Sequence, residues 1–163
     1  MAKVNLTAER MRELLHYDPE TGRISNRVSR HLAPAGLTSG FVGGDGYRHI
    51  KVSGIRYSAH RIAWLMTYGD WPVHEIDHCN GVKDDNRLCN LRDVTHQTNV
   101  QNLRSATSSS STGRLGVGPK HGRWRARITL NRKMIYLGTF ATQEDAESAY
   151  KAAKRDLHAG CTV

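Results

Sequence analysis

A carboxylate, an imidazole and two side-chain amides occur at a spacing that suits a small catalytic site. Asp77 and His78 are adjacent, and Asn90 and Asn99 follow at short intervals. Carboxylate and amide oxygens bind hard divalent cations, and a neutral histidine can take a proton from water. A cation and a general base together can hydrolyse a phosphodiester. The alternative is a turn aspartate beside a surface histidine, because an isolated Asp-His pair carries little information.

A hairpin and a helix must position these side chains. Residues 75–81 read as a strand, residues 85–91 as a turn-rich loop with a returning strand, and residues 93–99 as the start of a helix. The Asp-His pair then lies at the end of the first strand and Asn99 on the helix. The pattern predicts that the carboxylate, the imidazole and the amide oxygen come together.

The same residues resemble the signature of the HNH, or ββα-metal, endonucleases, and most closely that of the phage and intron-encoded homing endonucleases. The shared residues are Asp77-His78, Asn90-Leu91 and Asn99. The resemblance implies that His78 is the general base, that Asp77 and Asn99 hold a cation, and that Asn90 fixes the hairpin loop. It also implies products with a 5′-phosphate and a 3′-hydroxyl. An oxygen-only ligand shell favours Mg²⁺ or Mn²⁺.

Zinc is the competing metal for this segment. His74, Cys79, Cys89 and His96 could in principle converge, but structural zinc sites show closely spaced ligand pairs such as CxxC. The sequence has no CxxC pair, which argues against zinc. The three cysteines, Cys79, Cys89 and Cys161, are an odd number, and we expect reduced thiols.

The elements before the hairpin are less informative. Thr7 is placed to cap a first helix, residues 28–46 are glycine-rich and loop-like, and residues 47–58 alternate as a hairpin should. Residues 60–68 follow as a short helix. His60 begins this apolar helix, and we expect it to be a hydrogen-bonded packing residue.

The charge of the chain favours a polyanionic partner. Its 163 residues include 24 Lys+Arg and 15 Asp+Glu, for a formal net charge of +9. Ribosomal proteins are equally basic, so charge alone does not define the partner. With no apolar run of membrane length and no charged-then-apolar leader, we expect a cytoplasmic protein outside the membrane.

A Ser/Thr run separates two parts of different pattern. Its composition is typical of a flexible linker. We therefore expect a catalytic domain over residues 1–103, a linker over 104–112 and a second domain over 113–160. In the second part, Arg123, Arg125 and Arg127 alternate with apolar residues, which predicts a strand with one basic and one apolar face. Thr142 is placed to cap a helix further along, with Asp145 three residues on.

The second part resembles the APETALA2-type DNA-binding domain. The motifs that carry this resemblance are Gly116-Val117, Trp124-Arg125-Ala126, Leu137-Gly138-Thr139-Phe140 and Ala149-Tyr150. It implies a three-stranded sheet in the major groove of double-stranded DNA. The expected DNA contacts are Arg114, Arg123, Arg125, Arg127 and Tyr136. Leu115, Gly118 and Met134 stand where plant proteins tend to carry arginine, so the plant recognition sequence should not transfer.

The chain is therefore predicted to be α+β, with an N-terminal ββα-metal nuclease domain followed by a small three-stranded antiparallel sheet packed on one helix. We expect a monomeric DNA endonuclease of the homing type. The resemblance also implies a phage-encoded protein acting in the cytoplasm of a bacterial host. Two alternatives remain, a DNA-binding regulator with an inactive nuclease domain and an RNA- or ribosome-associated basic protein.

Overall fold

A computed structural model describes residues 6–29, 33–106, 110–158 and 160–161. The chain divides into two compact units, Met1–Thr95 and His96–Val163. Both combine short helices with small antiparallel sheets, as the α+β expectation requires. In the described part of the chain, no helix is long and apolar enough to cross a membrane.

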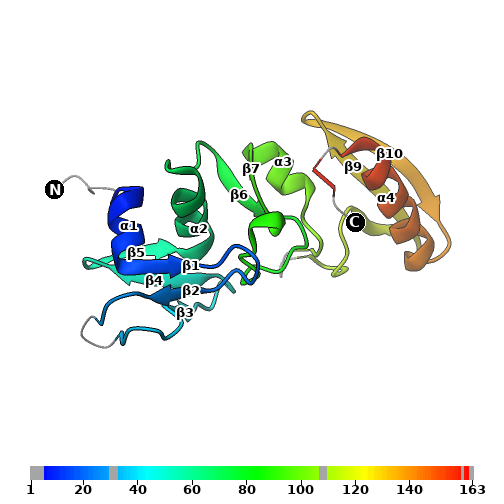
Figure 1. Ribbon diagram of the computed structural model, residues 1–163. Helices are drawn as coiled ribbons and strands as arrows, with labels where there is room; N and C mark the ends of the chain where they lie inside the picture. The colour runs from blue at the N-terminus through cyan, green and yellow to red at the C-terminus, as the bar shows by residue number, and fades with distance from the viewer. Residues whose placement is uncertain (1–5, 30–32, 107–109, 159, 162–163) are drawn as a thin grey trace. The chain divides into compact units, whose positions relative to one another are not determined.

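The first unit holds three small antiparallel sheets and two helices within its described residues. Its elements are α1 (Ala8–Leu14), β1 (Leu15–Tyr17), β2 (Ile24–Asn26), β3 (Phe41–Val42), β4 (Arg48–Val52), β5 (Ile55–Ser58), α2 (Ala59–Tyr68), β6 (Glu75–His78), the short 3₁₀ helix η1 (Leu88–Asn90) and β7 (Leu91–Val94) (Figure 1). The strands pair as β1-β2, β3-β4-β5 and β6-β7. The hairpin predicted over residues 47–58 and the helix predicted after it are confirmed as β4-β5 and α2. Strand β3 lies in a stretch predicted to be loop.

Local signals set the ends of both helices in this unit. The hydroxyl of Thr7 accepts a hydrogen bond from the backbone N–H of Arg10 at 3.3 Å, so the predicted cap of α1 is confirmed. Helix α2 ends at Gly69, whose φ of 91° is the left-handed conformation that glycine adopts most easily. Its N–H bonds the carbonyl of Leu65 at 2.9 Å.

One apolar core joins these elements. Its largest fully buried side chains are Met11, Leu15, Ile24, Ile50, Ile62, Leu65 and Val52. The β6-β7 hairpin enters the same core through Ile76 and Leu91. The strand that ends in Asp77 and His78 is therefore fixed by packing against both helices and the N-terminal hairpin.

The second unit is a sheet with a helix packed on it. Its described elements are α3 (His96–Gln101), β8 (Val117–Lys120), β9 (Arg123–Leu130), β10 (Lys133–Phe140) and α4 (Gln143–Leu157). The sheet order is β10-β9-β8, all antiparallel, and α4 packs across β9 and β10 (Figure 1). Thr142 caps α4 by accepting a bond from Asp145 N–H at 3.1 Å, as predicted.

Small residues let the helix approach this sheet closely. Ala146 and Ala126 are fully buried at the interface. Gly116 has φ 65°, and a Cβ added there would lie 2.2 Å from Tyr150 Cδ2. A larger residue at this position would therefore displace the ring that packs α4 onto the sheet.

The division between the units falls before α3, earlier than the predicted linker over 104–112. Within the second unit, Lys154 donates to the carbonyl of Leu103, and the N–H of Gly160 donates to a side chain of α3. These contacts group α3 and the segment after it with the C-terminal sheet. Residues 107–109 of the predicted linker lie outside the described residues. Independent folding of the two parts stays a prediction.

His60, the second residue of α2, differs in one respect from its expected role. It is buried, with 9% of its surface exposed, but among the described residues its Nδ1 has no hydrogen-bond partner. Its neighbours are the rings of Tyr47 and His78, so the hydrogen bond predicted for it is wrong. Burial, reinforced by the nearby charge of a protonated His78, lowers the pKa of His60 to about 3.

This pKa predicts acid-sensitive folding. The folded-state pKa of His60 lies below its ordinary value of 6.5, so the unfolded chain binds the proton more readily. Stability from the neutral ring should be complete above pH 6.5 and decline as the pH falls toward 3. The slope from this residue should be about 1.4 kcal/mol per pH unit. Urea unfolding at several pH values should show a shallower decline for His60→Phe; parallel curves would contradict the assignment.

Candidate active site and nucleic-acid interface

The β6-β7 hairpin brings Asp77 and His78 to the end of one buried strand. The register pairs Asp77 with Arg92 and His78 with Leu91. Both side chains are buried, with 6% and 4% of their surfaces exposed. A turn aspartate beside a surface histidine would be exposed, so burial argues against that alternative.

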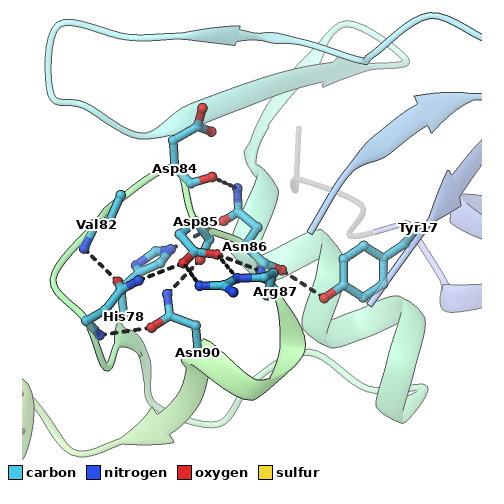
Figure 2. Close-up of polar contacts among 9 residues, drawn as sticks. Tyr17, His78, Val82, Asp84, Asp85, Asn86, Arg87 and Asn90 are labelled. Carbon is cyan, nitrogen blue, oxygen red and sulfur yellow. Dashed lines mark hydrogen bonds and ion pairs between the residues drawn. The ribbon is translucent and has the colours of Figure 1, made fainter. Parts of the chain in front are cut away.

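His78 is oriented by a side-chain amide. Its Nε2 lies 3.3 Å from Oδ1 of Asn86, while Nδ2 of Asn86 donates to the carbonyl of Asp84 at 3.2 Å (Figure 2). Because the amide oxygen only accepts, a neutral His78 carries its proton on Nε2 and its lone pair on Nδ1. Burial lowers the pKa of His78, and the bond to Asn86 offsets part of this effect. The ring is therefore neutral near pH 7, as a general base must be.

Asn86 is itself fixed by the N-terminal hairpin. The hydroxyl of Tyr17 donates to the Asn86 carbonyl at 2.8 Å in a buried contact (Figure 2). Arg87, the residue after Asn86, is also held against this hairpin. Gly22 lies so close to it that an added Cβ would be 2.4 Å from Arg87 N. Leu88 N–H bonds the carbonyl of Pro19. The loop that holds His78 is thus built onto a second hairpin.

Asn90 bridges the two sides of this loop. Its Nδ2 donates to the Asp85 carbonyl at 2.7 Å, and its Oδ1 accepts from Asn80 N–H at 2.9 Å. The Asp85 carboxylate is bound by Arg87 at 2.6 Å, which lowers the pKa of that carboxyl to about 2 (Figure 2). This is the geometry that a loop clamp requires.

Asp77 is paired across the hairpin. Nη2 and Nε of Arg92 donate to its Oδ2 at 2.7 and 2.9 Å. A carboxylate has two oxygens and about four lone-pair sites, so it can bind an arginine and a cation together. Asn99, the second predicted ligand, lies half-buried on α3 in the second unit, and its role stays a prediction. Among the described residues, no group of three or more His, Cys, Asp and Glu could hold a metal ion.

The predicted basic face lies on β9 of the second unit. Ala126 and Ile128 are buried toward α4, so Arg123, Arg125 and Arg127 lie on the opposite face. Tyr136 on β10 pairs with Arg127 in the register and is exposed, and Lys120 Nζ lies 4.8 Å from the centre of its ring.

Arg114 has a different environment from the other predicted DNA contacts. Its guanidinium forms an ion pair with Glu147 and another with Glu144, at 3.1 Å, both on α4. Its positive charge is thus balanced within the unit, and its contact with DNA stays a prediction.

The sequence interpretation missed several residues around the base. Asn86 and Tyr17 are distant from the motif and have no spacing that marks them. Arg92 could have been found, because pairing the two predicted strands antiparallel places it opposite Asp77. Lys120 could have been inferred from the sheet register.

Comparison with known proteins identifies the two parts. Residues 57–109 match the HNH endonuclease family, and this span contains Asp77, His78, Asn90 and Asn99. No solved structure matches the chain.

The curated relatives are plant regulators. The AP2-like ethylene-responsive transcription factor ANT of Arabidopsis thaliana is 43% identical over 70 residues, which cover 39% of this chain and 13% of that protein. The factor CRL5 of Oryza sativa subsp. japonica is 43% identical over 70 residues, covering 39% and 11%. A further A. thaliana factor is 33% identical over 102 residues, covering 58% and 29%. The chain thus spans less than a third of the length of these relatives, and it joins an HNH endonuclease segment to an AP2-type domain.

Proposed function

We propose that the protein is a metal-dependent DNA endonuclease in which His78 is the general base. The observation that carries the proposal is the burial of His78 beside Asp77 at the end of β6, with His78 Nε2 3.3 Å from Oδ1 of Asn86. The match of this segment to the HNH endonuclease family supports it. Burial, which keeps the ring neutral near pH 7, supports it as well.

The reaction is an in-line displacement at phosphorus. Nδ1 of His78 removes a proton from water as the water oxygen bonds to phosphorus, and the bond to the 3′ oxygen breaks. The departing 3′ oxygen takes a proton from solvent water, and the imidazolium returns its proton to solvent. The products are a 5′-phosphate and a 3′-hydroxyl. Asn86 holds the ring so that the same nitrogen faces the water in each turnover.

Asp77 and Asn99 are the proposed ligands of Mg²⁺ or Mn²⁺. When bound, the cation supplies positive charge to the phosphoryl and leaving oxygens. A carboxylate and an amide oxygen are hard donors and suit such a cation. Arg92 keeps the Asp77 carboxylate paired and oriented.

The C-terminal sheet is the proposed DNA-binding surface. The alternation along β9 places three arginines on the face away from the buried Ala126 and Ile128, and Tyr136 pairs with Arg127, which supports contact between this face and a major groove. The transcription-factor relatives support DNA binding by this part. Action as a monomeric, phage-encoded homing enzyme in a bacterial cytoplasm belongs to the same proposal.

A DNA-binding regulator is the second candidate, because the curated relatives are named transcription factors. A regulator would bind DNA without cutting it under any metal condition. The intact Asp77, His78, Asn90 and Asn99 favour the enzyme over this candidate.

Cleavage should require both the cation and the base. Supercoiled plasmid should be nicked with Mg²⁺, and chelator should abolish nicking. His78→Ala and Asp77→Ala should each lower the rate by about 100-fold or more, since general-base catalysis alone contributes about 10²–10⁴. His16→Ala, a change at an exposed histidine of β1, is the control and should cut normally. Undiminished cutting by folded His78→Ala would exclude His78 as the base.

Loss of Asn90 should lower stability as well as activity. In Asn90→Ala, the Asp85 carbonyl and the Asn80 N–H lose their buried partner, which should cost about 1–3 kcal/mol of unfolding free energy. Asn90→Asp keeps the acceptor for Asn80 N–H but loses the donor, so its unfolding free energy should lie between those of the wild type and Asn90→Ala. Unchanged melting with abolished cutting would instead place Asn90 among the catalytic groups.

DNA affinity should depend on the β9 arginines. Replacing Arg123, Arg125 and Arg127 with alanine should weaken binding and reduce the slope of log affinity against log salt by about 0.9 for each phosphate that is no longer neutralised. Arg155→Ala removes an exposed arginine from α4, on the other side of the sheet, and should have a smaller effect than Arg127→Ala. Fluorescence anisotropy with duplex DNA measures both. An unaltered slope in the triple variant would mean that DNA binds elsewhere.

A further inference from the structure

Three aromatic rings meet beside the proposed base. The ring centres of His60 and His78 are 5.1 Å apart with an interplanar angle of 88°, an edge-to-face contact. Tyr47 contacts both, at 5.2 Å from His60 and 5.8 Å from His78. His60 lies on α2, Tyr47 immediately precedes β4, and His78 ends β6, so segments distant in sequence build this cluster.

Packing, and not hydrogen bonding, holds His60 in the cluster. Its Nδ1 is buried and, within the described part of the chain, has no hydrogen-bond partner. Burial keeps the ring uncharged near pH 7. His60 therefore acts on its neighbours as a neutral, flat ring in an edge-to-face arrangement, which is a favoured geometry for aromatic pairs.

The ring contacts limit how the imidazole of His78 can turn. The His78–Asn86 hydrogen bond is 3.3 Å long, beyond the usual 2.7–3.2 Å range for N–H···O bonds. The terminal torsion of a histidine side chain has broad minima, so a bond of this length constrains the ring plane weakly. The rings of His60 and Tyr47 pack against the imidazole and restrict rotation about that torsion.

We propose that His60 is a positioning residue for hydrolysis, whose ring, together with Tyr47, clamps the imidazole of His78 in its reactive orientation. This inference rests on the proposed endonuclease function. The clamp acts through the shape of the ring at position 60. A substitution that keeps a ring there should therefore preserve the clamp, whereas a substitution that keeps only a polar atom should not.

Three substitutions in the full-length chain separate these contributions. His60→Ala removes the ring, His60→Phe keeps a ring without nitrogen, and His60→Asn keeps a polar atom near the position of Nδ1. His60→Ala should lower kcat for plasmid nicking by about 10- to 100-fold, the cost of a misplaced catalytic group. The Kd for duplex DNA should change by less than about twofold, because the ring is buried and away from solvent. His60→Phe should recover most of kcat, and His60→Asn should behave like alanine.

The control addresses general loosening of the helix. Ile62→Val removes one buried methylene from the same helix without touching either histidine. It should lower the melting temperature and leave kcat unchanged at temperatures well below melting. If kcat in the His60 variants simply followed melting temperature, as measured against Ile62→Val, the positioning role would be excluded.

A second measurement does not depend on cleavage. In ¹H–¹³C spectra, ring protons of His78 should be shifted by the adjacent rings, move toward unstructured values in His60→Ala, and return in His60→Phe. Unmoved His78 resonances in folded His60→Ala would overturn the clamp even if the protein cuts DNA. Shifted resonances in a protein that cuts no DNA would instead leave the ring contact established and refute the endonuclease function, and with it the catalytic meaning of the clamp. Full activity in His60→Ala, or rescue by asparagine but not phenylalanine, would also overturn the proposal.

Discussion

The hydrogen bond between His78 and Asn86 is the interaction on which the proposed site depends, because it places Nε2 of the imidazole against an amide oxygen that only accepts. The position of Asn86 is set by contacts with the N-terminal hairpin of the same unit. Tyr17 fixes the Asn86 backbone through a buried bond, and Tyr17 lies in the same core as Met11 and Ile24. A hydrogen bond of this kind adds only about 0.5–1.5 kcal/mol, but a buried partner left alone costs about 1–3 kcal/mol. Misfolding of the N-terminal hairpin would therefore disturb the contact that orients the imidazole of His78.

Two titratable side chains at the end of one strand receive opposite environments. Asp77 is buried beside the guanidinium of Arg92, so its charge has a partner. His78 is buried beside the rings of His60 and Tyr47, which offer no charge to stabilise an imidazolium. A paired carboxylate and a neutral imidazole are thus available together near pH 7. This separation of roles by environment is a recurring way to place an anionic ligand next to a base.

The sequence predicted what depends on neighbours in the chain. Thr7 and Thr142 were recognisable caps, and the alternation along residues 123–130 defined both faces of β9 because a strand has a period of two. The pairing of His78 with Asn86 was not predictable in this way, since it depends on how a loop closes in three dimensions. The hydrogen bond expected for His60 failed for the same reason. Its neighbours are Tyr47, just before β4, and His78, at the end of β6, and both present rings. The early unit boundary likewise follows from long-range contacts such as Lys154 to Leu103.

The two surfaces assigned to function follow opposite physical rules. The proposed base is buried beside the rings of His60 and Tyr47 and the amide of Asn86, because a proton-transfer group must keep one geometry. On β9 the arginines lie on a face that α4 does not cover, where each guanidinium keeps its charge for a phosphate or a base edge. Arg114 shows the contrast within one unit. Glu144 and Glu147 compensate its charge and hold it against α4. Breaking those pairs to reach DNA would leave two carboxylates facing a polyanion, so Arg114 serves the packing of the helix better than recognition. The proposed contacts of Arg123, Arg125, Arg127 and Tyr136 with DNA require no such rearrangement.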